Sequence, residues 1–338
     1  MTSWVDPSLG DDRWWDWQRL AYQQVHLGKL ELPTNVNDIS KADWTVFNQN
    51  RVAYNNVLPF YESREFLEAR RKFLRVAASA SSTSSEAFGI RGPAYGGKTT
   101  TLRHILFEYF VSQHGKPPED LTDVPDGKEQ IPVIWGQASD TRKATLLQLL
   151  EFLNVPHTSG SAENLSQQLR QAVIKYQVKF IVLDDLHRLN LNYKRNEAGD
   201  ALKTMMDGMR RTTFLFTTTD SDACGALTGK GGEQVRRRID WHDYRPMTKT
   251  GKSWKGAIKH WEEHLPLCYD RKDGPLLEPM SDYLFARTDG HLGYLATLLK
   301  RGANDTILNK KITDERLTIE RLNAIGLGED APPLRNAA

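Results

Sequence analysis

Residues 92–99 read Gly-Pro-Ala-Tyr-Gly-Gly-Lys-Thr, a complete Gly-x4-Gly-Lys-Thr pattern. A strand-like run, Ala87–Arg91, precedes it, and the residues after it predict an amphipathic helix over Thr99–Gln113. Glycines let backbone N–H groups approach phosphate oxygens closely, and a helix N-terminus adds a partial positive charge. The stretch therefore predicts a phosphate-binding loop between a strand and a helix. The alternative is a glycine-rich turn with a surface lysine.

Residue types within this loop predict individual roles toward a nucleoside triphosphate. We expect Lys98 to reach the β- and γ-phosphates and the Thr99 hydroxyl to be a ligand of Mg²⁺. The residues expected to contact the nucleotide are Gly92, Pro93, Ala94, Tyr95, Gly96, Gly97, Lys98, Thr99 and Thr100.

The acidic partner of such a loop is expected at the end of a buried strand, and Phe180–Leu183 followed by Asp184 and Asp185 fits this expectation. Asp184 would hold Mg²⁺ through water, and Asp185 would orient or deprotonate the attacking water. A glutamate is more usual at the second position, so the shorter Asp185 predicts slow hydrolysis. The alternative is an ordinary strand end in which Asp185 caps the next helix.

Short apolar runs alternate with longer helical patterns after residue 86, which predicts an α/β fold with a parallel sheet covered by helices on both faces. From about residue 250 helical patterns replace the strands and predict a helical lid. The domains expected are an N-terminal helical region with a Ser-rich linker (1–85), a nucleotide-binding core (86–248), a lid (249–325) and a loose tail (326–338). The strands expected are 87–91, 131–136, 180–183 and 213–217, and the helices are 65–80, 99–113, 145–153, 164–176, 198–210, 254–264, 276–287, 292–308 and 314–322.

Composition sets limits on the class of protein. The 338 residues carry 45 Lys and Arg against 43 Asp and Glu, so contact with nucleic acid requires a local basic patch. Two cysteines exclude a disulfide scaffold and a four-cysteine zinc site. Apolar runs are too short for a membrane span and the N-terminus lacks the apolar segment of a signal peptide. We expect a cytoplasmic protein without membrane contact.

Two later stretches carry further candidates. In Thr213–Thr219, a threonine-rich strand end, Thr218 is favoured to sit between the γ-phosphate and the acidic strand; high strand propensity alone explains the stretch nearly as well. In Gln234-Val-Arg-Arg-Arg238, Arg238 is favoured to reach the γ-phosphate of a neighbouring subunit. The three arginines could instead grip a phosphodiester backbone or form a solvated basic face.

Taken together, these motifs resemble those of AAA+ ATPases, and more narrowly those of the TniB/TnsC-type transposition ATPases. The resemblance runs from about residue 44 to residue 322. The segments that carry it are Arg51-Val-Ala-Tyr54 with Tyr61, Gly89–Thr100, Ile131–Trp135, Val182–His187, Gln234–Arg238, Trp261–Leu267, Thr288–Gly293 and Ile312–Glu315. The chain departs from the family at Asp185, in the glycine-rich stretch 225–232, and near Gly290-His291, where no arginine supplies a second sensor.

The resemblance implies a protein that binds ATP and Mg²⁺ and forms a homo-oligomer, ring or filament, on double-stranded DNA without sequence preference. It also implies recruitment of a transposase, contact with a target-selection protein, and disassembly on hydrolysis. The corresponding DNA-contacting residues are Thr141, Arg142 and Lys143, although Ser139 or Thr141 could simply cap a helix. The N-terminal tryptophans Trp4, Trp14, Trp15 and Trp17 could dock a partner but are expected to pack within the protein.

Two other classes of function remain open from the sequence. One is a nucleotide-gated signalling or defence switch that binds proteins rather than DNA. The other is a replication initiator or helicase loader that binds origin DNA. No appended helix-turn-helix is recognisable, although an initiator would need to prefer one DNA sequence.

Overall fold

The computed structural model describes residues 12–33, 39–40, 43–79, 86–114, 130–156, 160–190, 197–222, 224–269, 272, 274–309, 314–328 and 331–332. In this part of the chain five strands pair in parallel in the order β2-β3-β4-β1-β5. The strands are β1 (Ala87–Arg91), β2 (Val133–Gln137), β3 (Phe180–Asp184), β4 (Thr213–Thr218) and β5 (Ile239–Asp243). The helices are α1 (Trp14–His26), α2 (Trp44–Val57), α3 (Arg64–Ser79), α4 (Lys98–His114), α5 (Arg142–Phe152), α6 (Ala162–Lys175), α7 (Glu197–Gly208), α8 (Gly229–Arg236), α9 (Lys252–His264), α10 (Ser281–Thr288), α11 (Leu292–Leu308) and α12 (Ile319–Asn323).

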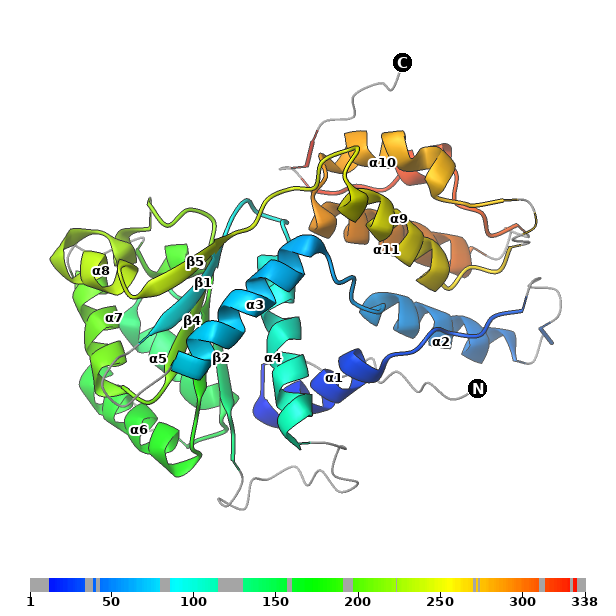
Figure 1. The fold of residues 1–338 in the computed structure, drawn as a ribbon. Coiled ribbons are helices and arrows are strands. Elements are labelled where there is room, and N and C mark those ends of the chain that lie inside the picture. Colours follow the sequence, from blue (N-terminus) through cyan, green and yellow to red (C-terminus); the bar gives the residue numbers. More distant parts are fainter. Residues whose placement is uncertain are drawn as a thin grey trace.

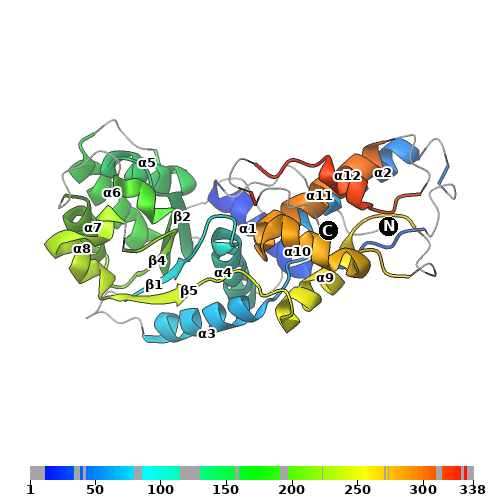
Figure 2. The ribbon, with the colours of Figure 1, turned by 90° about the horizontal axis from the view of Figure 1, so that it is seen from above.

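Helices cover both faces of the sheet, as the alternating sequence pattern predicts. Figure 2 shows α5, α6, α7 and α8 on one face and α3 and α4 on the other. β3 is an interior strand that pairs with β2 and β4, and all five of its residues are buried. A strand covered on both faces is expected to be apolar at every position, and Phe180–Leu183 is. The α/β fold class is confirmed.

Several predictions about elements need correction. The strand β5 and the helix α8 were not anticipated, whereas α1 and α2 lie in the expected N-terminal helical region, for which the sequence predicted no individual bounds. β5 lies at a sheet edge and buries only Ile239 and His242, so its sequence Ile-Asp-Trp-His-Asp lacks an apolar run. α8 begins inside the glycine-rich stretch 225–232, and its Gly232 packs too closely against the backbone of Leu227 to carry a side chain. α4 is a helix as expected but is not amphipathic, since α1 covers the face that would otherwise meet solvent (Figure 1).

Two of the N-terminal tryptophans join the main core. Trp14 and Trp17 are at most 1% exposed and pack edge-on against Phe110 of α4, with ring centroids 5.3 and 5.6 Å away. Trp15 is partly exposed, and Trp4 lies outside the described residues. The prediction that the N-terminal tryptophans pack within the protein is therefore confirmed for Trp14 and Trp17. Most of the predicted linker and tail also lies outside the described residues.

The buried apolar residues form two clusters, and the N-terminal region contributes to both. α1 and α3 pack into the cluster that contains the sheet, whereas Tyr54 and Leu58, at the end of α2, belong to the cluster formed by α9 to α12. The fully buried Arg51 of α2 forms an ion pair with Glu315 and donates a 3.2 Å hydrogen bond to the carbonyl of Pro266. Removing one partner of a buried pair leaves the other charge buried without a partner, so this pair ties α2 to the segment around Glu315. None of the described helices is long and apolar enough to cross a membrane.

The link between α2 and α3 stacks on α4 through a buried histidine. The rings of Phe60 and His104 lie 4.0 Å apart between centroids, and burial lowers the pKa of His104 to about 4, assisted by the positive charge of Arg70. The Glu108 carboxylate lies 3.8 Å from His104 Nε2, but Arg70 binds it at 2.7 Å, so it offers little stabilisation to an imidazolium.

This histidine predicts a loss of stability in acid. Between pH 6.5 and pH 4 the unfolded chain binds a proton at His104 and the folded chain does not, so the free energy of unfolding falls as the pH falls. We expect His104 to contribute a loss on the order of 2 kcal/mol between pH 7.5 and pH 4.5. Urea unfolding of the wild type and of His104→Gln at both pH values measures it. Equal losses in the two proteins would contradict the assignment.

Candidate active site

The phosphate loop, residues 92–97, connects the end of β1 to the start of α4. The Gly92 N–H donates a 3.2 Å hydrogen bond to the carbonyl of Thr218, and a Cβ at Gly92 would lie 2.3 Å from the carbonyl oxygen of Tyr244. Gly97 has a φ of +97°, which residues with a side chain rarely adopt. Only glycine therefore fits at these two positions, and the loop is held closely against the ends of β4 and β5.

Lys98 is the first residue of α4, and its side chain turns back over the loop. Its Nζ donates a 2.7 Å hydrogen bond to the carbonyl of Pro93, and the residue is 7% exposed. Burial lowers the pKa of Lys98, while the nearby carboxylates Asp185 and Asp184 oppose this shift. A buried ammonium held by one carbonyl can exchange that contact for phosphate oxygens, which are stronger acceptors.

A buried carboxylate lies beside Thr99. Asp184 is the last residue of β3 and is 6% exposed; its Oδ1 accepts a 3.0 Å hydrogen bond from Thr99 Oγ1 and another from Thr217 Oγ1. Burial raises the pKa of Asp184, and the bond from Thr217 works in the opposite direction. Hydroxyl and carboxylate oxygens are ligands that Mg²⁺ prefers, so this pair fits the ion. No group of three or more His, Cys, Asp or Glu in the described residues could hold a metal ion, so phosphates and water would complete the coordination.

Asp185 lies one residue beyond β3 in a left-handed conformation, with a φ of +55°. Its N–H donates a 3.0 Å hydrogen bond to Thr217 Oγ1, and its Oδ2 accepts a 3.1 Å bond from Gln137 Nε2. An aspartate tolerates this conformation better than most residues with a side chain. Gln137, at the end of β2, is a site residue that the sequence analysis missed; the expected strand stopped one residue short of it.

The structure distinguishes between the two threonines at the end of β4. Thr217 is fully buried and its hydroxyl bridges Asp184 and the backbone of Asp185, whereas Thr218 Oγ1 donates a 3.3 Å bond to the carbonyl of Asp220. Side chains alternate across a strand, so only one of two neighbours can face the carboxylates. The contact expected of Thr218 is therefore made by Thr217.

The three consecutive arginines lie where α8 ends and β5 begins. Arg238 precedes β5, which pairs in register with β1, so it lies six residues along the strand from the level of Gly92, roughly 20 Å away. Arg238 forms an ion pair with Asp207 at 2.6 Å and Arg236 with Asp222 at 2.5 Å; Arg237 is exposed. The structure thus does not bring Arg238 to the phosphate loop of its own chain.

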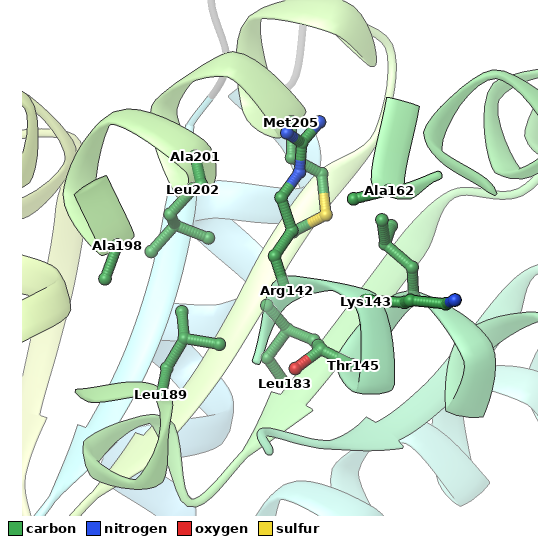
Figure 3. A pocket seen from close by; sticks show the side chains of 11 residues that line it. Arg142, Lys143, Thr145, Ala162, Leu183, Leu189, Ala198, Ala201, Leu202 and Met205 are labelled. Atoms are coloured by element: carbon green, nitrogen blue, oxygen red, sulfur yellow. The ribbon is translucent and has the colours of Figure 1, made fainter. Parts of the chain in front are cut away.

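The residues expected to contact DNA lie at the start of α5. Thr141 Oγ1 accepts a 3.1 Å bond from the Ala144 N–H, so Thr141 caps the helix, as the alternative interpretation has it. Arg142 pairs with Glu163 at 3.2 Å, and Lys143 is exposed. Figure 3 shows Arg142 and Lys143 beside an apolar pocket of about 250 Å³ between α5, α6 and α7.

A second hollow adjoins the phosphate loop and was not expected from the sequence. It has a volume of about 300 Å³ and lies between the loop, the α2–α3 link and α11. We call it the base groove. Its lining includes Asn56, Val57, Leu58, Pro59, Phe60, Tyr61, Gly97, Thr100, Thr101, Trp261, Leu292, Ala296 and Lys300. α11 joins the loop directly, because the Gly293 N–H donates a 2.9 Å bond to the Tyr95 carbonyl and the rings of Tyr95 and Tyr294 stack 4.4 Å apart.

Comparison with known proteins agrees with this geometry. Residues 84–222 match the family model described as AAA domain, so this part of the chain is similar to AAA domains. The ORC2 protein of Aeropyrum pernix, solved in ADPNP–ADP complexes, is 16% identical with a TM-score of 0.54, over 81% of this chain and 70% of that one. The ORC1 protein of Aeropyrum pernix, in complex with DNA, is 15% identical with a TM-score of 0.54, over 78% of this chain and 65% of that one. These identities establish the AAA+ fold alone. No curated protein matches the sequence.

The position of Asp185 leads to a prediction about turnover. Asp185→Asn keeps the size of the side chain but removes its basicity, so we expect ATP affinity within about threefold of wild type and hydrolysis at least about a hundredfold slower. Single-turnover hydrolysis and calorimetric titration measure the two quantities. Asp220→Asn, an exposed change outside the site, is the matched control. Unchanged hydrolysis in Asp185→Asn would exclude Asp185 as the group that activates water.

Proposed function

We propose that the site binds ATP with Mg²⁺ and hydrolyses it slowly. The observation that carries this proposal is the 3.0 Å contact between Thr99, at the start of the helix that follows the phosphate loop, and the buried Asp184. In the proposed complex the N–H groups of residues 92–100 surround the phosphates, and Lys98 binds the β- and γ-phosphates. Thr99 and Asp184 hold Mg²⁺, which would neutralise charge on the phosphates.

Asp185, Gln137 and Thr217 are proposed to position the attacking water. Gln137 holds the Asp185 carboxylate at 3.1 Å, and Thr217 holds the Asp185 backbone at 3.0 Å. A carboxylate fixed in this way can accept a proton from water that lies between it and the γ-phosphate. The side chain is one methylene shorter than glutamate, which supports slow rather than fast turnover.

We further propose that the protein acts on DNA as an oligomeric regulator of transposition of the TniB/TnsC type, with residues 86–248 as the nucleotide core and 249–325 as the lid. The motif resemblance over residues 44–322 supports this role, and the similar ORC1 fold is one solved with DNA. An arginine of the 236–238 group would complete a neighbouring subunit's site, and Arg238 lies at the start of β5, away from the loop of its own chain. A transposase would be the downstream partner.

A replication initiator is the second candidate. The ORC2 and ORC1 folds extend over 81% and 78% of the chain, including part of the lid, and this extent favours it. An initiator prefers one DNA sequence, whereas a TniB/TnsC-type protein binds any duplex. Competition between random-sequence duplexes and genomic fragments separates the two candidates.

Nucleotide binding is tested with one variant in the phosphate loop and one control variant outside it. We expect Lys98→Ala to weaken ATP binding at least about a hundredfold, because it removes a charged hydrogen-bond donor to two phosphates. We expect Lys143→Ala to leave ATP affinity unchanged, because Lys143 is exposed and belongs to another surface. Calorimetry on folded protein measures both. Absence of ATP binding by the wild type would overturn the proposed function.

DNA binding is tested by electron microscopy and by affinity at several salt concentrations. With a non-hydrolysable ATP analogue we expect oligomers on random-sequence duplex, and an affinity that falls steeply with log salt because basic side chains displace counterions. Lys143→Ala should reduce the slope by about one unit if Lys143 contacts a phosphate. A protein that ignores duplex DNA at low salt would instead point to a signalling switch.

A further inference from the structure

The base groove extends from the phosphate loop along one face of α11. Leu292, Ala296 and Lys300 all line it, and because they are four residues apart they lie on the same side of the helix. Eight residues of α-helix span about 12 Å, so Lys300 lies about that far from the end of α11 that contacts the phosphate loop. A nucleotide whose phosphates lie in the loop would extend its base toward this far end.

Lys300 is a cation without an acidic partner in the described part of the chain. Its Nζ donates a 2.7 Å hydrogen bond to the carbonyl oxygen of Asn56, and the side chain of Asn55 donates a 2.8 Å bond to the Lys300 carbonyl. Burial alone lowers the pKa of Lys300 to about 8. An ammonium group has three donors, so up to two remain after the bond to Asn56. Lys300 is partly buried and its bond to Asn56 is accessible from the surface, so a ligand in the groove can take up the remaining donors.

The two atoms of this contact present a donor and an acceptor side by side. Lys300 Nζ donates, and the Asn56 carbonyl has a second lone pair that can accept. Adenine displays the matching arrangement, with a ring nitrogen that accepts next to a 6-amino group that donates. Guanine displays two acceptors, N7 and O6, on the corresponding edge, and O6 would then face the Asn56 oxygen.

We propose that Lys300 and the Asn56 carbonyl read the base of the bound nucleotide, with Lys300 donating to a ring nitrogen of adenine and Asn56 accepting from its 6-amino group. This assignment rests on the proposed ATP site and adds its base specificity. Neither residue touches the phosphates in this arrangement. Lys300 therefore contributes to affinity for ATP but not to affinity for a triphosphate that lacks a base.

The test compares ATP, GTP and inorganic tripolyphosphate on three proteins: wild type, Lys300→Met and Lys259→Met. Lys259 is an exposed lysine of α9 outside the groove and serves as the control. We expect Lys300→Met to weaken ATP about tenfold or more, to reduce the preference for ATP over GTP, and to leave tripolyphosphate binding unchanged. Lys259→Met should resemble wild type with all three ligands.

Two results would overturn the assignment: an ATP-to-GTP ratio unchanged in Lys300→Met, or an equal loss of tripolyphosphate binding, which would place Lys300 at the phosphates. A measurement on wild type alone covers the case in which Lys300→Met does not fold. Purine riboside triphosphate lacks the 6-amino group, and we expect it to bind about tenfold more weakly than ATP; equal affinity would refute the role of Asn56. Failure of wild type to bind any of these ligands would instead refute the ATP site itself.

Discussion

The buried carboxylate of Asp184 is the group on which the arrangement of the site depends. Two hydroxyls, from Thr99 and Thr217, donate to it, and it lies where β3, β4 and the start of α4 meet. Burial disfavours the charged form of Asp184. The neighbouring hydroxyl donors stabilise the ionised carboxylate, and the proposed cation would stabilise it further. β3, β4 and α4, which come from distant parts of the sequence, are thereby brought into one hydrogen-bonded group. Asp185 joins this group through Thr217, and Gln137 joins it through Asp185.

A second constraint acts on the C-terminal helices α9 to α12. The buried pair of Arg51 and Glu315 ties α2 to this part of the chain, and α11 contacts the phosphate loop through Gly293 and the stacked rings of Tyr95 and Tyr294. A Cβ at Gly293 would lie 2.4 Å from the Tyr95 carbonyl oxygen, so a side chain there would force α11 away from the loop. The base groove exists because α2, α4 and α11 are fixed relative to one another in this way. A nucleotide bound there would contact all three and so couple phosphate chemistry to lid position.

Several features could be predicted from the sequence because their signals are local. The phosphate loop needs its glycines at fixed spacing, and a strand buried on both faces needs the apolar run of Phe180–Leu183. β5 and α8 could not be predicted, since an edge strand with Asp240 and Asp243 and a helix with three glycines contradict their local propensities. Tertiary packing overrode these propensities. The choice between Thr217 and Thr218 likewise depends on the register between β3 and β4, which pairs Leu183 with Phe216 and so brings Thr217 beside Asp184.

The sequence by itself determined the α/β class, the loop that ends β1, and the acidic end of β3, because each depends on residues close together along the chain. Only the tertiary structure decided that α2 packs with the lid, that Thr217 and Gln137 join the carboxylates, and that Lys300 meets Asn56 in the base groove. These contacts connect residues up to 264 positions apart. No periodicity or motif records such a pairing, since it arises only when the folded elements exclude water and satisfy one another's buried polar groups.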